Sequence, residues 1–378
     1  MSADARRFEG RTTRAAVLRE IGRPMEVEEL EIAEPGPGEV MVKLGAGGTC
    51  HSDLHVLNGE WAEVRRPIVL GHEGAGTVEA VGAAVEKLGV GDRVLLSWLP
   101  SCGRCRYCLT GRPQLCAAAP ETVFENLARD GTTRLRSGDE DVYSMLTVGS
   151  MGEHTVVPES GAIPLDDAVP FDRAAVVGCA VTTGFGAAVK TARVGPGDSA
   201  VVIGCGGVGL SVLQGCATQS ADPLIAIDTN PEKLETARRF GATAAIDAST
   251  TEPIEAVAEL TGGGADFAFE AIGLKRTIEQ ALGMLAPGGA MVLVGMPPDG
   301  VKVEIDPNLM AGFEHRVLGC NYGSSVPADD FPRILTLYRR GHIDLDSMIT
   351  RRLSLEHVNE AFEEMTAGRG IRTVVTYD

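Results

Sequence analysis

The stretch from Ala200 to Asp228 reads AVVIGCGGVGLSVLQGCATQSADPLIAID and indicates the fold class of the second half of the chain. An apolar run typical of a buried strand, Ala200–Ile203, leads directly into the glycine-rich turn Gly204–Gly209. Apolar residues from Val208 to Ala217 then follow helical spacing, and a second buried strand, Leu224–Ile227, ends at Asp228. A strand, a tight turn, a helix and a further strand predict the beginning of a parallel sheet.

The same alternation continues beyond Asp228. The pattern predicts a helix over Pro231–Phe240 with proline in its first turn, then a strand over Phe267–Glu270. A helix over Thr277–Leu285 and a strand over Ala290–Val294 follow. Strands that alternate with helices predict a doubly wound parallel sheet, so the fold class is α/β.

The first 160 residues have a different sequence pattern. Short apolar runs are separated by turn clusters such as Pro35–Gly38 and Gly89–Asp92. We expect an all-β region with insertions, not a repeat of strand–helix–strand units. The tail after about Val326 is expected to be helical and to end in the strand Thr373–Thr376. The expected strands of the β-rich region are Ala15–Leu18, Glu39–Leu44, Gly76–Val81, Arg93–Leu96 and His154–Val157.

Composition narrows the classes of function. The 378 residues are 44% hydrophobic and 23% charged, which excludes a mainly disordered chain and favours two globular domains. A formal charge of −18 repels phosphate groups, so we expect neither nucleic acid nor an anionic membrane as a partner. The absence of a long apolar window and of a secretory signal near the N-terminus predicts a cytoplasmic protein without a membrane-spanning helix.

Four cysteines carry the strongest chemical signal: Cys102, Cys105, Cys108 and Cys116 follow the spacing Cys-x2-Cys-x2-Cys-x7-Cys. Four thiolates can close a tetrahedral zinc site with no open position, so this zinc would be structural. Iron–sulfur clusters use the same spacing, but this loop lies in a β-rich region and has no Cys-Pro, which favours zinc.

The glycine turn is typical of dinucleotide binding because it follows a strand and opens a helix. Its glycines allow a tight turn and a close approach of the pyrophosphate, which the free N–H groups of the helix N-terminus can bind. Asp228 stands 19 residues past Gly209, where a carboxylate binds the ribose hydroxyls and repels a 2′-phosphate. The sequence therefore predicts NAD in preference to NADP.

Scattered polar residues complete the pattern: Cys50 in GTCHSDLH, His72 and Glu73 in LGHEG, and Cys179 in VGCA. Taken singly, Cys179 could be a core thiol and His72 a turn histidine. Together with the motifs above, from Ala15 to Thr376, they resemble the zinc-dependent alcohol dehydrogenases of the medium-chain dehydrogenase/reductase family. The resemblance implies a GroES-like β-rich catalytic domain over 1–180 and 327–378 and a Rossmann domain that binds NAD over 181–326.

The resemblance also implies a catalytic site. Cys50, His72 and Cys179 would bind a catalytic zinc and leave its fourth position open for substrate. Ser52 would stand beside the substrate oxygen, and His55 would end a proton relay to solvent. Asp53 and Glu73 would be carboxylates behind the zinc ligands, with Asp53 orienting the zinc histidine; a solvated turn residue is the alternative for Asp53.

Cofactor contacts follow from the same resemblance. His51 and Arg372 would touch the pyrophosphate, and Lys233 would contact the adenosine ribose unless it is an ordinary exposed helix lysine. The remaining cysteines Cys205, Cys216 and Cys320 are expected to be buried thiols. The full set of implied cofactor contacts is His51, Thr183, Gly204, Gly206, Gly207, Val208, Gly209, Asp228, Lys233 and Arg372.

The implied substrate pocket contains Trp61, Trp98, Leu146 and Met296, with Tyr322 nearby, and its two tryptophans favour an aromatic or allylic alcohol. The implied reaction is reversible hydride transfer between a primary or secondary alcohol and NAD. Two alternatives stay open: a thiol-adduct formaldehyde dehydrogenase, although His55 stands where that branch usually has tyrosine, and a nicotinoprotein that never releases NAD. The insertion over 117–150 is typical of the dimeric branch of the family, so we expect a homodimer that holds two zinc ions per chain.

Overall fold

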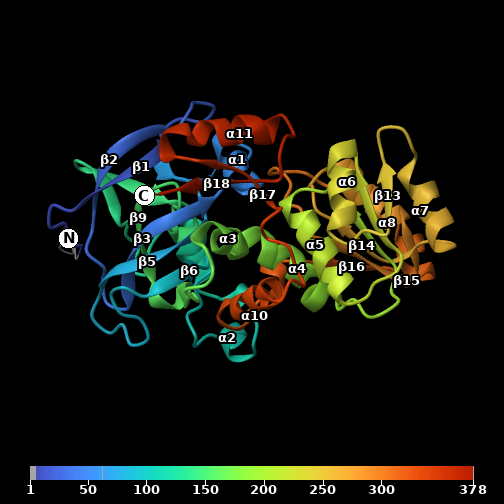
Figure 1. Ribbon diagram of the computed structural model, residues 1–378, viewed down its shortest axis with the longest axis horizontal. Coiled ribbons are helices and arrows are strands. Elements are labelled where there is room, and N and C mark those ends of the chain that lie inside the picture. The colour runs from blue at the N-terminus through green and yellow to red at the C-terminus, as the bar shows by residue number, and fades with distance from the viewer. Residues whose placement is uncertain (1–5, 62, 378) are drawn as a thin grey trace. The chain divides into compact units, whose positions relative to one another are not determined.

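Residues 6–61 and 63–377 are described by the computed structural model, in which they group into two units (Figure 1). Unit 1 contains the described residues up to Cys179 together with Val326–Thr336 and the residues from Leu345 onward. Unit 2 contains Ala180–Ser325 and Leu337–Asp344. The segment Leu337–Asp344 thus groups with unit 2, whereas the boundary inferred from the sequence put it with the catalytic domain.

Unit 1 contains a closed barrel that both antiparallel and parallel pairs hold together. β1 pairs with β2 on one side and with β4 on the other, with Val17 opposite Val69 in the second pair. β4 pairs in parallel with β8, which closes the barrel. In barrel order the strands are β1 (Thr12–Leu18), β2 (Glu26–Ile32), β7 (Leu135–Ser137), β8 (Glu140–Ser144) and β4 (Ile68–Val69).

A seven-stranded sheet forms the rest of the framework of unit 1. Its central strand β3 pairs antiparallel with β5, β9 and the C-terminal β18, so residues from both ends of the chain meet in one sheet. β17 pairs in parallel with β18 at the sheet edge. The strands are β10 (Ala162–Pro164), β6 (Arg93–Leu96), β5 (Glu73–Val81), β3 (Glu39–Gly48), β18 (Arg372–Thr376) and β17 (Ile349–Leu353), with β9 (His154–Pro158) beside β3.

Apolar residues of the barrel strands pack in one core with residues of α1 and α11. In this core Leu18, Ile32 and Val56 have no exposed surface. Our expectation of strands alone over the first 160 residues was wrong for His51–Asn58, which forms helix α1. The local cause is its N-terminal cap: Cys50 is extended, and the Asp53 carboxylate accepts a hydrogen bond from the Cys50 N–H at 2.8 Å. The other helices that begin in this unit are α2 (Arg106–Leu109), α3 (Phe171–Val176), α10 (Pro327–Arg339) and α11 (Val358–Thr366).

Unit 2 confirms the doubly wound parallel sheet. Its central strand β11 pairs in parallel with β12 and β14, with Val201 opposite Ile225 and Ala268. The strands in sheet order are β13 (Ala244–Asp247), β12 (Leu224–Asp228), β11 (Ala200–Ile203), β14 (Ala265–Glu270), β15 (Leu285–Leu293) and β16 (Arg316–Gly319).

Four of the helices of unit 2 pack against this sheet (Figure 1). The predicted helix Thr277–Leu285 is displaced: it spans Lys275–Gly283, and Leu285 already begins β15, because Leu285 pairs with Ala265 of β14. The helices are α4 (Thr182–Gly186), α5 (Gly207–Thr218), α6 (Pro231–Arg239), α7 (Pro253–Thr261), α8 (Lys275–Gly283) and α9 (Pro307–Gly312).

One helical run, Phe171–Ala192, is long and apolar enough to cross a membrane by length and composition. However, 72% of that window is buried inside the structure, as in the core helix of a water-soluble protein. Its apolar character is therefore explained by packing.

Candidate functional site

The Asp53 carboxylate organises the first part of the site. It accepts hydrogen bonds from the backbone N–H of Cys50 and from that of Gly71 at 3.0 Å, and it lies 3.1 Å from Nδ1 of His72. Asp53 is fully buried, so the solvated-turn alternative is wrong. Because Asp53 engages Nδ1, the other ring nitrogen of His72, Nε2, is available as a metal ligand.

Four potential ligand atoms converge around that histidine. Cys50, His72, Glu73 and Cys179 each offer one donor atom, and these atoms all lie within 4.8 Å of one another. Cys50 caps α1, Glu73 begins β5, and Cys179 lies in a π-helical turn after α3. Close approach requires glycine at position 48, because a Cβ there would lie 2.1 Å from the Glu73 carboxylate.

Electrostatics distinguish the members of this cluster. The hydrogen bond shared with Cys179 lowers the pKa of the Cys50 thiol well below its ordinary value, whereas the same bond raises that of Cys179. Burial would lower the pKa of His72, but the nearby Asp53 and Cys50 charges raise it well above its ordinary value. In this buried group, two thiols and an imidazole share one negative charge. Such a group is a suitable site for a divalent cation. Its sulfur and nitrogen donors favour zinc.

Glu73 has a buried cation as its partner. Arg372 of β18 donates a hydrogen bond to Glu73 Oε2, and the two side chains are 6% and 0% exposed. Burial raises the pKa of the Glu73 carboxyl to about 7, and Arg372 offsets part of this effect. The predicted pyrophosphate cation is thus held against the metal cluster, a pairing that residue spacing did not indicate.

The predicted relay residues lie on α1. The Ser52 hydroxyl is 3.8 Å from Cys50 Sγ, which places it beside the metal cluster. His55 is 4% exposed, and its Nδ1 contacts the Glu60 carboxylate. The exposed His51 begins α1, and its ring stands edge-on to that of His55 at a centroid distance of 4.9 Å. Glu60 was missed by sequence reasoning.

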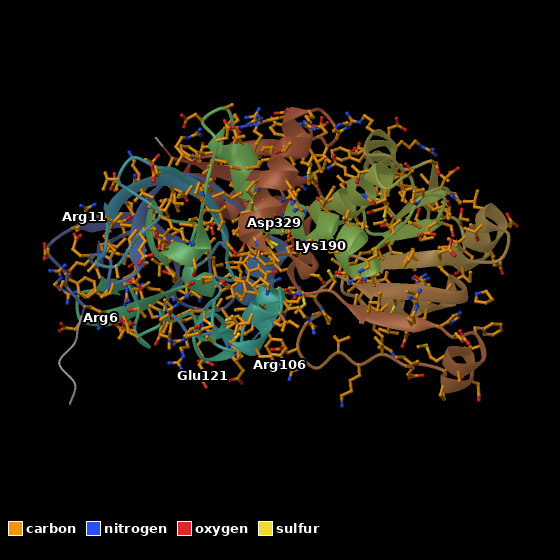
Figure 2. All side chains as sticks on the ribbon, turned by 90° about the horizontal axis from the view of Figure 1, so that it is seen from below. Arg6, Arg11, Arg106, Glu121, Lys190 and Asp329 are labelled. Atoms are coloured by element: carbon orange, nitrogen blue, oxygen red, sulfur yellow. The ribbon has the colours of Figure 1, made fainter. Side chains whose placement is uncertain are left out.

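The four-cysteine loop brings its sulfur atoms together as predicted. Cys108 Sγ lies 3.9 Å from Cys102 Sγ and 3.5 Å from Cys105 Sγ, close to the ~3.8 Å edge of a tetrahedron with Zn–S bonds of ~2.3 Å. Backbone N–H groups from Ala117 and Cys108 lower the pKa of Cys105 to about 6. These donors fit a closed zinc site. Figure 2 shows the exposed side chains of Arg106, on α2 in this loop, and Glu121, in the insertion that follows.

The glycine turn of unit 2 has the backbone that its sequence predicts. Gly204 has a φ of 96°, and a Cβ at Gly209 would lie 1.7 Å from the Gly204 carbonyl oxygen. Gly206 caps α5. Asp228 Oδ2 accepts a hydrogen bond from Cys205 N at 2.8 Å, and Oδ1 accepts one from Asn230 N at 2.9 Å. The carboxylate is therefore fixed at the end of β12, beside the turn.

Other predicted cofactor residues of unit 2 lie on neighbouring helices. Thr183 is on α4, which packs closely on α5: a Cβ at Gly184 would lie 2.2 Å from the carbonyl oxygen of Val208. Lys233 is half-buried on α6, so it is not a fully exposed helix lysine.

The predicted pocket residues divide between the units. Trp98 stands edge-on to His72 with ring centroids 6.5 Å apart, and Trp61 stacks on His55 at 4.8 Å. Leu146 packs at the edge of the unit 1 core with a φ of 50°. Met296 belongs to unit 2 and is 58% exposed there, and Tyr322 is buried in unit 2. Unit 1 alone therefore places two aromatic rings beside the metal and relay histidines.

The fold and the two donor sets together are those of a two-domain, zinc-type dehydrogenase. Family models agree with this assignment: the alcohol dehydrogenase GroES-like domain matches residues 36–167, and the zinc-binding dehydrogenase domain matches 207–340. The chain belongs to the zinc-type alcohol dehydrogenases of the medium-chain dehydrogenase/reductase family, and it is an oxidoreductase.

Individual relatives support the family assignment. The chain is 40% identical to an NDMA-dependent alcohol dehydrogenase from Amycolatopsis methanolica, over 97% of this chain and 99% of that protein. It is 37% identical to an S-(hydroxymethyl)glutathione dehydrogenase from Komagataella pastoris, over 96% of this chain and 97% of that protein. The crystal structure of a benzyl alcohol dehydrogenase from Acinetobacter calcoaceticus has a TM-score of 0.92 and 31% identity, covering 97% of this chain and 100% of that one.

Proposed function

We propose that this protein oxidises a primary or secondary alcohol, with preference for aromatic or allylic alcohols, and transfers the hydride reversibly to NAD. The observation that carries the proposal is the buried group Cys50, His72 and Cys179 with the Ser52 hydroxyl beside it. Three such ligands leave a coordination position for a substrate oxygen, which a site of four cysteines does not.

The two donor sets support two zinc ions per chain. Cys50, His72 and Cys179 would hold the catalytic ion, and Cys102, Cys105, Cys108 and Cys116 the structural one. A zinc ion held at the first site would polarise the oxygen of an alcohol and lower its pKa, and bound NAD would supply the hydride acceptor.

The residues of the chain perform the proton and charge steps. Ser52 accepts the hydroxyl proton of the substrate as its own hydroxyl proton passes on, and His55 receives a proton at the end of the relay. Asp53 holds the His72 ring in a fixed orientation through Nδ1. Arg372 balances the buried Glu73 charge next to the thiolates. Trp61 and Trp98 give the site an aromatic lining.

The glycine turn and Asp228 support NAD as the cofactor. The N-terminus of α5 offers free N–H groups for a pyrophosphate. A fixed carboxylate at the end of β12 accepts hydrogen bonds from ribose hydroxyls and repels a 2′-phosphate.

A second candidate function is favoured by the relative from Amycolatopsis methanolica, which is named for its dependence on NDMA. In this version NAD stays bound and an added acceptor reoxidises it. A third candidate, oxidation of a thiol adduct of formaldehyde, is favoured by the S-(hydroxymethyl)glutathione dehydrogenase.

One panel separates the three candidates. Purified protein is assayed with ethanol, benzyl alcohol, cinnamyl alcohol and formaldehyde plus glutathione, each with NAD, with NADP and with NDMA. NADH formation from benzyl or cinnamyl alcohol supports the leading proposal. Turnover only with NDMA, together with nucleotide released on denaturation, supports the second candidate. Activity only with formaldehyde and glutathione supports the third.

We also propose a cytoplasmic homodimer. None of the nine cysteines, all of which the structure describes, forms a disulfide, as is typical of a reducing compartment. β16 ends the six-stranded sheet of unit 2, and exposed apolar side chains precede it, namely Val301, Ile305, Leu309 and Phe313. An edge strand beside apolar surface is suited to pairing with a second copy. Light scattering after size-exclusion chromatography should give twice 39.6 kDa, and a monomer would contradict this part of the proposal.

A further inference from the structure

The C-terminal end of α1 folds back onto a single residue of the helix, His55. Gly59 adopts the left-handed conformation with a φ of 74°, which ends the helix and reverses the chain. The next two residues then donate their backbone N–H groups to the His55 carbonyl oxygen, Glu60 at 2.8 Å and Trp61 at 3.4 Å. The turn is locally fixed, because a Cβ at Gly59 would meet Ile21 at 2.6 Å.

The same two residues also hold the His55 side chain. Glu60 Oε2 contacts Nδ1 at the ring edge. The Trp61 ring stacks on the imidazole face, with centroids 4.8 Å apart and an interplanar angle of 29°. His55 is 4% exposed, whereas the Glu60 side chain is 36% exposed and reaches solvent.

The chemistry of this contact fixes the tautomer of the ring. An ionised carboxylate can only accept hydrogen bonds, so Nδ1 of His55 must carry the proton. The hydrogen bond from His55 lowers the pKa of the Glu60 carboxyl, so this group is ionised at neutral pH. Nε2 is then left with its lone pair, and it is the only ring nitrogen that can receive a proton.

We propose that Glu60 and Trp61 form a clamp on His55, in which Glu60 is a positioning residue that sets the tautomer and stabilises the protonated ring, and Trp61 fixes the ring plane. The inference rests on the proposed alcohol oxidation, in which His55 receives the substrate proton. In that step Nε2 gains one proton, the ring becomes a cation next to the Glu60 carboxylate, and the proton then leaves to water.

Two polar side chains that the structure describes against this pair are those of His51 and Asn58. His51 stands edge-on to His55 at 4.9 Å, and Asn58 Nδ2 donates to Glu60 Oε1 at 3.4 Å. A second positive charge at His51 would oppose protonation of His55, which makes the Glu60 charge more important. The backbone N–H of Glu60 holds the turn, so a replacement of the Glu60 side chain leaves that hydrogen bond in place.

The test compares Glu60→Gln, Glu60→Ala and Glu60→Asp with a matched control, Glu63→Gln. Glu63 is an exposed carboxylate three positions away, so its variant loses the same charge from the same loop. We expect Glu60→Gln to move the acidic limb of the kcat profile for benzyl alcohol to lower pH by about half a unit, because an uncharged partner no longer stabilises the protonated ring. The tautomer should also no longer be fixed, because an amide can donate as well as accept a hydrogen bond.

Glu60→Ala should lower kcat roughly fivefold at neutral pH with little change in KM, since a relay base contributes through the proton step alone. Glu60→Asp should return the pH profile toward that of the wild type. Glu63→Gln should leave kcat, KM and the pH profile unchanged. If the Gln and Ala variants at position 60 match this control, the clamp is wrong.

A measurement without turnover separates failure of the clamp from failure of the proposed function. In a spectrum of the 15N-histidine-labelled protein, the His55 signal is identified by its loss in His55→Gln. The nitrogen shifts should show a proton on Nδ1 in the wild type and a tautomer mixture in Glu60→Gln and Glu60→Ala. A proton on Nε2 in the wild type would overturn the inference even if alcohol oxidation is observed. Absence of alcohol oxidation would overturn the proposed function and leave this readout intact.

Discussion

Arg372 on β18 donates a hydrogen bond to Glu73 at the start of β5, across 299 positions of sequence. Both strands pair with β3, which brings the last strand of the chain next to the metal-binding segment. Because both side chains are buried, neither charge has water as an alternative partner.

Arg372→Met should therefore lower the free energy of unfolding of unit 1 by about 3–5 kcal/mol above neutral pH, because ionised Glu73 would lose its buried cation. At lower pH the loss should be smaller, because the Glu73 carboxyl, whose pKa burial already raises to about 7, would be protonated. Urea unfolding followed by tryptophan fluorescence reports on unit 1, since Trp61 and Trp98 both lie there. Arg372→Met combined with Glu73→Gln should recover most of the loss. If the double variant is as unstable as Arg372→Met alone, the pair is not the cause.

Metal content distinguishes the two donor sets. The protein should contain two zinc ions per chain by elemental analysis, one of which a chelator removes together with activity. Cys50→Ser should lose the labile ion and keep the fold, because the three-ligand site is open. Cys102→Ser should lose the other ion and lower stability, because a closed metal site contributes folding energy. Iron in the Cys102–Cys116 loop would contradict the zinc assignment.

The choice of cofactor should depend on the charge of Asp228. Asp228→Asn keeps an acceptor for the Cys205 N–H but removes the negative charge. The ratio of kcat/KM with NADP to kcat/KM with NAD should therefore rise roughly tenfold or more. A tenfold change corresponds to about 1.4 kcal/mol. Asp228→Ser should change the ratio in the same direction and also loosen the turn. A wild type that already prefers NADP would contradict the role given to Asp228.

His55→Gln should retain zinc and NAD but slow alcohol oxidation by roughly tenfold, since a relay end that solvent can replace contributes less than a base in direct contact with substrate. The loss should be greatest below neutral pH, where the hydroxyl proton is hardest to remove. Added imidazole should restore part of the rate. If the pH–rate profile of His55→Gln equals that of the wild type, the proton leaves by another route, and His51 is the next residue to replace.

The stability of unit 1 should depend on pH through Asp172. Burial would raise the pKa of its carboxyl, but hydrogen bonds from Arg173 at 2.6 Å and Arg352 at 2.8 Å outweigh burial and lower it. The folded pKa lies below the unfolded one, so this stabilisation is complete above about pH 4 and is lost as pH falls through the folded value. Asp172→Asn should cost about 1–2 kcal/mol at pH 7 and progressively less at acid pH. An equal cost at both pH values would show that charge is not involved.

Sequence periodicity was sufficient for the parallel sheet of unit 2. Ala200–Ile203 matches β11 residue for residue, and Pro231–Phe240 differs from α6 by one residue. The signals for these elements lie within a few neighbouring residues. They are apolar runs, a glycine turn and a proline in the first turn of a helix. The four-cysteine loop was predictable for the same reason, because its ligands lie within 15 residues.

Residue types and spacing thus determined by themselves the alternation of strands and helices, the closed metal loop and the glycine turn, since these are short-range features of the chain. The tertiary structure decided what depends on distant segments. It placed Arg372 on Glu73 and buried Asp53 behind His72. Burial and long-range pairing set these contacts, and neither follows from the spacing of residues along the chain.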